Sequence, residues 1–459
     1  MSRNHITRRA FLAATTTATV AAATGCATKT NTAKVVPGKR SPNELINIAA
    51  IGAGGKGFTD IMQCYKSGMV NVVALADVDW KRAEECFYNL RETSAVHYKD
   101  YREMLDKHPE IDACTISTPD HTHAPAAYLA MNLGKHVYVQ KPLTHTIAEA
   151  RLLMETAAKN GVVTQMGNQG HCGNGVRDLC EMIWDGAIGQ VTEAHIWTNR
   201  PVWPQGKDFP APLPGQPVPD TMDWDLWIGA APMRPYNEGY APFSWRGWWD
   251  FGCGAIGDMA CHIMDPAFWS LKLYEAETFE VETIFQEGMT DQSPPNKSII
   301  KFKVPARGDM AAVDVYWHDG GMLPERPAGI PADQQLGDGD NGSLYIGTDG
   351  FATAGEYGGD ARLMPDERMA SYTRPDQTIP RIPEESPYLD WLTAIREGHK
   401  SVSDFSYAAL LTEMANFGNV ALLAGKPLAW DRNAFKITND EAANALLTKE
   451  YRKGWELPC

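Results

Sequence analysis

The sequence lacks the excess of basic residues that nucleic acids and anionic membranes require of a protein partner. Its 459 residues include 42 Lys and Arg against 57 Asp and Glu, which gives a formal net charge of −15. An acidic surface repels phosphate backbones and anionic lipids, so we expect no nucleic-acid partner. No apolar run approaches the ~20 residues that a membrane-spanning helix needs.

Closely spaced cysteine and histidine motifs are missing as well. The nine cysteines form no Cys-x-x-Cys pair, so we expect most of them to be small buried residues, and nothing selects a disulfide pair. The spacings of Asp258, His262 and Asp265, and of His121 and His123, would allow a metal. No other ligand-rich motif accompanies them, so we expect no metal.

Apolar and aromatic residues are plentiful. Apolar residues make up 44% of the chain, with 14 Trp, 16 Tyr and 14 Phe. This composition supports a large core and excludes wholesale disorder. At ~150 residues per domain, the length predicts two or three domains.

Residues 1–25 have the pattern of an export signal. A twin arginine at positions 8 and 9 precedes a weakly apolar Ala/Thr stretch that ends in small residues. The alternative is an amphipathic or disordered N-terminus. The letters ATGC ending at Cys26 resemble a bacterial lipoprotein cleavage box, in which Cys26 is lipidated, and residues 26–43 then form a polar tether. We expect export by the twin-arginine route to the periplasm, with membrane attachment only through a lipid anchor.

Residues 44–166 have the pattern of a dinucleotide-binding domain. A continuous apolar run over 45–52, typical of a buried parallel strand, leads into a Gly-x-Gly-x-x-Gly motif and a helical stretch. Gly52 permits the tight turn, Gly54 lets the backbone approach a pyrophosphate, and Gly57 allows close helix–strand packing. For the glycines alone, the alternative is an ordinary turn.

The next strand ends in an acidic residue. A strand predicted over Val70–Ala76 is followed by Asp77, 25 residues after Gly52. A carboxylate there hydrogen-bonds both ribose hydroxyls and repels a 2′-phosphate, which favours NAD over NADP. Lys81 and Arg82 follow closely and would soften that preference.

Strands and helices alternate through the rest of this domain. Further strands are predicted over Val96–Tyr98, Asp112–Ser117, His136–Gln140 and Val162–Met166, with helices between them. Repeated βαβ units build a doubly wound, Rossmann-type parallel sheet, which binds ligand at the carboxyl ends of its strands.

Three segments together resemble the Gfo/Idh/MocA family, the group of glucose–fructose oxidoreductase and inositol dehydrogenase. They are AAIGAGGKGF, TPDHTHAPAAYLAMNLGKHVYVQKPL and GCGAIGDMACHIMD. The resemblance implies a Lys-Pro beneath the nicotinamide, matched by Lys141-Pro142, and an active-centre Asp and His, matched by Asp258 and His262. Relatives usually carry Glu where this chain has Gln140, which changes the electric field around Lys141.

The resemblance also implies further contacts in the cleft. We expect cofactor contacts from Thr118, Pro119, His123 and Asn168, and substrate contacts from Gln169 and His171. A Gly-rich connector is the alternative for the segment around Asn168.

The active-centre residues suit alcohol oxidation on chemical grounds. In a helix after Gly252–Gly257, Asp258, His262 and Asp265 fall on one face. A His beside a carboxylate can act as general base for a sugar hydroxyl, and a cation such as Lys141 would stabilise alkoxide charge. Alternatively, Asp258 caps a helix and His262 is a partly buried histidine with satisfied hydrogen bonds.

Residues 167–459 are expected to form a substrate-binding and oligomerisation domain. Predicted strands such as Thr278–Phe285 and Ser298–Val304 fit an α+β domain with an open, mainly antiparallel sheet. By resemblance, the free face of that sheet is the interface of a homo-oligomer. Trp245, Arg246 and Trp249 are candidates for a sugar pocket, because Trp faces stack on sugar rings and Arg bonds hydroxyls. Core packing is the alternative for the tryptophans.

These features predict an NAD-dependent carbohydrate oxidoreductase that transfers hydride between a sugar or cyclitol carbon and a tightly bound nicotinamide. An exported enzyme has no soluble NAD pool to draw on, so we expect it to retain NAD and restore it at every turnover. One alternative is an NAD-dependent, redox-neutral glycoside hydrolase that oxidises its substrate transiently, eliminates the leaving group and reverses the oxidation. Another is a non-catalytic sugar-binding lipoprotein.

Overall fold

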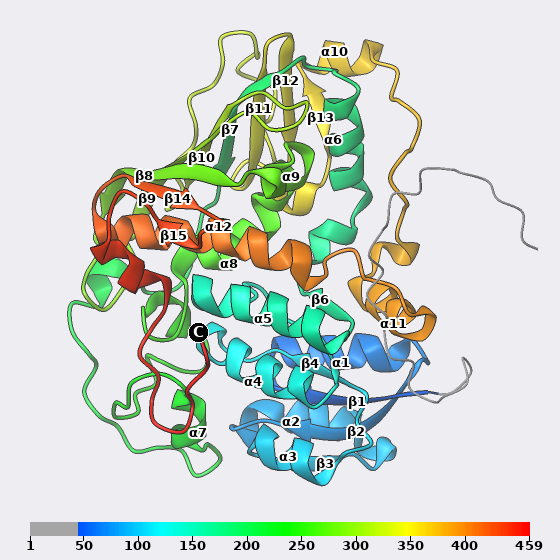
Figure 1. Cartoon of the computed structure of the whole chain (residues 1–459), viewed down its shortest axis with the longest axis vertical. Coiled ribbons are helices and arrows are strands. Elements are labelled where there is room, and N and C mark those ends of the chain that lie inside the picture. Colours follow the sequence, from blue (N-terminus) through cyan, green and yellow to red (C-terminus); the bar gives the residue numbers. More distant parts are fainter. Residues whose placement is uncertain (1–44) are drawn as a thin grey trace, which may run out of the picture. The chain divides into compact units, whose positions relative to one another are not determined.

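The structure, a computed structural model, describes residues 45–459, and these residues carry two sheets (Figure 1). The predicted signal, Cys26 and the tether up to residue 43 lie outside the described residues. Among residues 45–459, no helix is long and apolar enough to cross a membrane.

The first sheet is parallel and has six strands in the order β3-β2-β1-β4-β5-β6. Its strands are β1 (Ile46–Ile51), β2 (Val70–Ala76), β3 (Val96–Tyr98), β4 (Ala113–Ile116), β5 (His136–Val139) and β6 (Thr164–Met166). Helices cover both faces: α1 (Lys56–Lys66) and α2 (Trp80–Asn89) on one, and α3 (Tyr101–Lys107), α4 (Asp120–Asn132) and α5 (Ile147–Asn160) on the other (Figure 1). The predicted doubly wound Rossmann-type sheet is confirmed.

Strand register brings the ends of four strands to one edge of this sheet. Ile51 of β1 pairs with Ala76 of β2 and with Ile116 of β4, and Ile116 in turn pairs with Val139 of β5. The glycine turn, Asp77, the segment after β4 and the segment after β5 therefore emerge side by side. The strand order reverses between β1 and β4, and such a switch point is where open parallel sheets bind ligands.

The second sheet has nine strands in the order β13-β12-β11-β7-β10-β9-β8-β14-β15. Only β10 and β7 pair in parallel, and the other neighbours are antiparallel, which confirms the predicted, mainly antiparallel second sheet. Its strands are β7 (Val191–Trp197), β8 (Thr278–Glu287), β9 (Lys297–Val304), β10 (Val313–His318), β11 (Gly342–Gly347), β12 (Gly350–Ala354), β13 (Arg362–Met364), β14 (Leu428–Asp431) and β15 (Lys436–Ile437).

Further α-helices follow β6 along the chain. They are α6 (Asn174–Trp184), α7 (Trp224–Ile228), α8 (Gly254–Ile263), α9 (Asp265–Ser270), α10 (Asp366–Ser371), α11 (Pro387–Glu397) and α12 (Phe405–Ala424). The 20-residue α12 is apolar around most of its circumference and packs against α5, α8 and β8, so it is buried between elements of both sheets (Figure 1).

One helix of the second half returns to the parallel sheet. Trp391 and Leu392 of α11 are fully buried in the cluster that holds Ile48 and Val72 of the parallel strands. A second cluster runs without interruption from Ile51 to residues of the nine-stranded sheet such as Phe302. The core is therefore shared between residues before and after position 166.

Candidate active site

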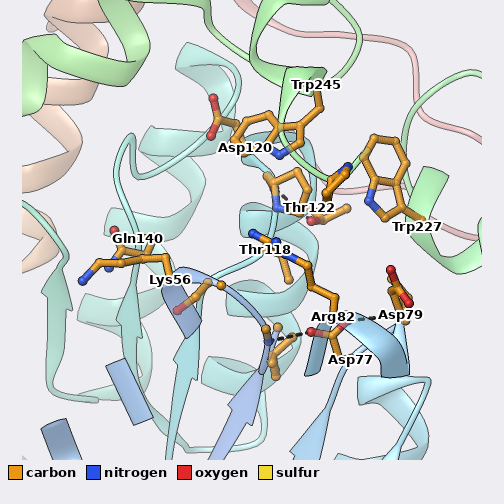
Figure 2. A pocket seen from close by; sticks show the side chains of 18 of the residues that line it. Lys56, Asp77, Asp79, Arg82, Thr118, Asp120, Thr122, Gln140, Trp227 and Trp245 are labelled. Atoms are coloured by element: carbon orange, nitrogen blue, oxygen red, sulfur yellow. Dashed lines mark hydrogen bonds between the residues drawn. The ribbon is translucent and has the colours of Figure 1, made fainter. Parts of the chain in front are cut away.

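A cavity of about 580 Å³ lies at the carboxyl ends of the parallel strands. This volume is within the range of small-molecule and cofactor sites. Its lining combines the segments after β1, β2, β4 and β5 with side chains from the second half of the chain, among them Trp227 and Trp245 (Figure 2).

The glycine turn has the geometry that the motif predicts. Gly52 has φ +82°, in the region that glycine adopts without strain, and Gly52 and Gly54 line the cavity. Gly57 is buried behind the turn, where an added Cβ would stand 1.7 Å from the carbonyl oxygen of Gly52. Helix α1 therefore begins against the turn, with its N-terminal N–H groups toward the cavity.

Asp77 is fixed beside this turn. The backbone N–H groups of Gly54 and Asp79 donate to its carboxylate at 2.8 and 2.9 Å (Figure 2). Burial raises the pKa of Asp77 to about 6, although these hydrogen bonds counteract the rise. Arg82 lines the same part of the cavity, opposite the turn.

A buried carboxylate that the sequence analysis did not single out lies beneath the cavity. Asp60 of α1 is fully buried and accepts hydrogen bonds from Ser117 at 2.7 Å, Gln140 at 2.8 Å and Tyr388 at 2.7 Å, and Lys56 pairs with it at 2.9 Å. Gln140 is therefore a donor to an acid on a neighbouring helix. A glutamate at position 140 would bring two carboxylates face to face.

Asp258 lies among cations. Lys141 Nζ donates to its Oδ1 at 2.9 Å and to its backbone oxygen at 2.6 Å, Arg246 Nε donates to Oδ1 at 3.2 Å, and Arg200 Nε is 3.9 Å from Oδ2. Burial by itself would raise the pKa of Asp258, but the charges of Lys141 and Arg246 outweigh it and hold that pKa well below the ordinary range. Asp258 is therefore an anion at neutral pH.

His262 lines the cavity one helical turn from Asp258. Its side chain is 4% exposed, and its Nδ1 has no hydrogen-bond partner within residues 45–459. Burial, and next to it the charge of Lys141, lowers the pKa of His262 well below its ordinary value, so the ring is neutral. Tyr357, which the sequence analysis missed, places its ring edge-on at 4.6 Å from that of His262.

The structure corrects two expectations about this helix. Helix α8 begins at Gly254 and ends at Ile263, so Asp265 opens the next helix, where its carboxylate bonds His171 and Tyr407. Asp265 therefore does not share a face with Asp258 and His262. The hydrogen bonds of Asp258 go to cations and not to His262, because the lysine after β5 reaches the same carboxylate.

Several predicted contacts lie where expected around the cavity. They are Gly52, Gly54, Asp77, Thr118, Pro119, Lys141, Gln169, Trp245, Arg246 and His262. The guanidinium of Arg246 lies 4.2 Å from the ring centre of Trp245, so the cation is held between that ring and Asp258.

Apart from Gly57 and Asp258, which lie behind the cavity wall, four predicted contacts do not line the cavity. His123 is buried, with Nδ1 2.9 Å from the oxygen of Pro142 and Nε2 2.8 Å from that of Thr118, so it braces the two segments that do. Asn168 accepts from Ser403 at 2.7 Å and faces the core.

The other two are held by partners elsewhere. His171 is 2% exposed, bonds Asp265 at 2.9 Å and stacks on Trp269. The indole of Trp249 donates to the oxygen of Thr290 at 3.1 Å. Both expectations were wrong for the same reason. Each side chain bonds a nearby polar partner in the fold and is thereby held away from the cavity wall.

Most described cysteines are buried, as their spacing led us to expect. All described cysteines are free, and each is buried apart from the exposed Cys459. Within residues 45–459, no three His, Cys, Asp or Glu side chains stand close enough together to hold a metal ion.

Sequence comparison places this chain among described oxidoreductases. The model of an oxidoreductase family with an NAD-binding Rossmann fold matches residues 46–168, and that of the same family's C-terminal α/β domain matches 183–301. Curated relatives include a glycosyl hydrolase family 109 protein of Shewanella sp., 32% identical over 178 residues, and an alpha-N-acetylgalactosaminidase of Shewanella oneidensis, 31% identical over 179 residues. Each alignment covers 37% of this chain and 38% of the relative, so the chain matches less than half the length of these relatives.

Solved structures share the fold at low identity. The WlbA dehydrogenase from Bordetella pertussis, in complex with NADH and UDP-GlcNAcA, has a TM-score of 0.59 and 15% identity over 84% of this chain and 99% of its own. A levoglucosan dehydrogenase in complex with NADH has a TM-score of 0.54 and 16% identity over 84% of this chain and 98% of its own. The two family models together span more than half of the sequence. The chain therefore belongs to the Gfo/Idh/MocA oxidoreductase family, with an NAD-binding Rossmann domain followed by the family's C-terminal α/β domain.

Proposed function

We propose that this protein is an NAD-dependent carbohydrate oxidoreductase that transfers hydride between a sugar or cyclitol carbon and a tightly held nicotinamide. The observation that carries the proposal is a single cavity in which Lys141 and His262, with Asp258 behind them, stand beside the glycine turn and Asp77.

The cavity fits a dinucleotide. Gly52 and Gly54 themselves bring no side chain to the cavity, so the backbone of the turn can approach a pyrophosphate, and Arg82, which lies against Gly54 and Gly55, adds a positive charge there. Asp77 presents a carboxylate to a ribose. Thr118 and Pro119 form the adjoining wall. NAD, when bound, supplies the hydride chemistry, and the protein supplies position and proton management.

His262 is the candidate base. Its ring lines the cavity and, being neutral, can accept the proton of a substrate hydroxyl. Lys141 stabilises the oxygen as that proton leaves, because its ammonium is fixed by Asp258 at 2.9 Å. In this arrangement Asp258 positions the cation, whereas the sequence alone suggested that it orients the histidine.

The sugar-binding end is aromatic and polar. Trp245 offers an apolar face, and Arg246 and Gln169 offer hydrogen-bond donors next to His262. This combination suits a ring with C–H faces and directed hydroxyls.

A second candidate function is the redox-neutral glycoside hydrolase. Its support is the similarity to a glycosyl hydrolase family 109 protein and to an alpha-N-acetylgalactosaminidase at 31–32% identity over part of the chain. The same base, cation and nicotinamide would serve a transient oxidation followed by elimination.

We further propose that the protein is exported by the twin-arginine route, lipidated at Cys26 and assembled as a homo-oligomer. The twin arginine and the small residues before Cys26 support the first two statements. The third is supported by the alternation of buried and less buried residues along β8 and β9, which leaves one face of the nine-stranded sheet less covered. Mass spectrometry of the mature N-terminus and light scattering of the purified protein test them.

The deciding experiment uses protein purified without added cofactor. The protein is denatured to quantify released NAD(H), and native absorbance near 340 nm is followed with sugars and aryl glycosides. A lasting absorbance rise identifies a dehydrogenase, whereas aglycone release without one identifies the glycosidase. A chain that neither carries nor takes up nucleotide contradicts both.

Replacement of the base is the first mutational test. His262→Ala should lower the rate of hydride transfer about 10²- to 10⁴-fold, the usual contribution of a general base, while leaving bound NAD unchanged. His195→Ala, which alters a histidine on the nine-stranded sheet, is the matched control and should retain full activity. Full activity in His262→Ala would refute the assignment.

A further inference from the structure

Two segments from far along the chain line the end of the cavity beyond Asp77. The first, residues 219–231, which we call the cover segment, contributes Met222, Leu226 and Trp227. The second, the C-terminal tail from residue 449, contributes Trp455. Figure 2 shows Trp227 facing Asp79, which lies two positions after Asp77.

The cover segment is attached by its backbone to the turn after β2. Met222 forms a bridge with Asp79, the N–H of Asp223 donates to the oxygen of Val78 at 2.8 Å, and the N–H of Trp80 donates to the oxygen of Thr221 at 3.2 Å. The segment therefore lies against the chain that holds Asp77, and its Trp227 lines the same cavity.

The tail is attached to the cover segment. The N–H of Arg452 donates to the oxygen of Ala230 at 3.1 Å, and its guanidinium donates to the oxygen of Gly229 at 2.8 Å. Trp455 is 8% exposed, and the guanidinium of Arg102 lies 4.2 Å from its ring centre. The fold thus fixes the indole by burial and by this cation.

The enclosed end of the cavity has the chemistry of a purine site. Val78, Tyr101 and Thr122 of the nucleotide domain complete a lining in which apolar and aromatic surface predominates beyond Asp77. A flat heterocycle stacks on such surface, and Asp77, which lines the same cavity, can hydrogen-bond the ribose attached to that heterocycle.

We propose that the cover segment and the tail form an adenosine clamp that binds the adenine of NAD and holds the cofactor through turnover. The inference rests on the proposed NAD-dependent function and adds the residues that make retention possible. Because folding already fixes both walls, binding orders little more of the chain, and such preorganisation acts mainly by slowing dissociation.

The test measures dissociation of NADH from the full-length protein by loss of its fluorescence in excess NAD. Trp455→Ala removes the stacking surface, and Arg452→Ala removes the attachment of the tail without removing a side chain that lines the cavity. We expect each to accelerate NADH release about 5- to 150-fold, the range of aromatic–base stacking. Trp184→Ala, on α6 away from the cavity, is the matched control with an unchanged rate.

Reduced nicotinamide mononucleotide, which lacks the adenosine half, separates a clamp from a general loss of structure. Its affinity should be the same in wild type and Trp455→Ala. Equal NADH release rates in wild type and both folded variants overturn the clamp, as does an equal weakening of both ligands. Wild type that binds neither ligand would instead refute the proposed function.

Discussion

Asp60 and Gln140 show at the scale of single residues how this chain has placed charge beneath its cofactor cavity. The carboxylate sits on α1, fully buried, and four polar groups surround it, one of them the amide of Gln140. The buried negative charge beside position 140 is therefore supplied by a helix and not by the strand end. A buried charge is tolerated when every partner is in place.

Exchanging these two residues tests the arrangement. Gln140→Glu should destabilise the protein by about 2–4 kcal/mol at neutral pH, because two carboxylates would compete for one set of donors. The loss should shrink near pH 4–5, where the introduced Glu can take up a proton. Adding Asp60→Asn should restore much of the stability, as measured by urea unfolding. If the double variant is no more stable than Gln140→Glu, the two residues are not coupled.

Asp77 gives cofactor binding a pH dependence. Its pKa is raised to about 6, and only the ionised carboxylate accepts hydrogen bonds from both ribose hydroxyls. NAD affinity should therefore be constant above pH 7 and fall by up to about tenfold per unit below pH 6. Fluorescence titration with NADH measures it. Asp77→Asn should bind more weakly and without this dependence, and a wild-type profile that is flat to pH 5 would contradict the role.

Helix α1 and the turn before it act as one element. Gly57 touches the backbone of Gly52 so closely that no side chain can be added unless the helix moves. The same contact aims the first N–H groups of the helix at the cavity. Packing and phosphate binding therefore depend on one glycine.

Gly57→Ala should cost about 1–3 kcal/mol of stability and lower NAD affinity at least about tenfold, because the helix must withdraw from the turn. Gly134→Ala provides the control: this glycine has φ +74° and open space around it, so alanine there strains the backbone without reaching the cavity. The Gly134→Ala variant should lose about 1 kcal/mol of unfolding free energy and keep its NAD affinity. Isothermal titration and thermal unfolding of both variants decide the question.

At the scale of the whole molecule, a shared core cluster and a shared cavity join the two halves. The core cluster contains Ile51 of the parallel sheet and Phe302 of the nine-stranded sheet, and α12 packs on elements of both. The cavity is likewise lined from both halves. Ionised Asp77 costs folding free energy as the pH rises from its unfolded pKa of 3.8 through about 6, and a bound cofactor offsets that cost.

NAD should therefore stabilise the described body as a unit. At a free NAD concentration 100 times the dissociation constant, mass action adds about 2.7 kcal/mol to the free energy of unfolding. Calorimetry should show a single transition that moves upward with NAD. Two transitions, of which NAD moves one, would mean that the halves unfold independently.

Local pattern determined a large part of this protein. The parallel sheet, the glycine turn, Asp77 and most strands of the second sheet follow from periodicity and turn residues over short stretches, whereas the short strands β13, β14 and β15 were not predicted. The positions of Lys141, Asp258 and His262 follow from motif resemblance. These features are readable because backbone geometry and side-chain spacing are set by near neighbours.

Only the tertiary structure decided which partner each polar side chain of the site bonds. Asp258 bonds Lys141 across 117 positions, Asp60 bonds Tyr388 across 328, and His123 and His171 turn away from the cavity toward buried acceptors. The aromatic wall from Trp227 and Trp455 is likewise assembled from segments more than 200 positions apart. No local pattern encodes these choices, because a buried polar group takes whichever partner the completed fold brings within hydrogen-bond distance.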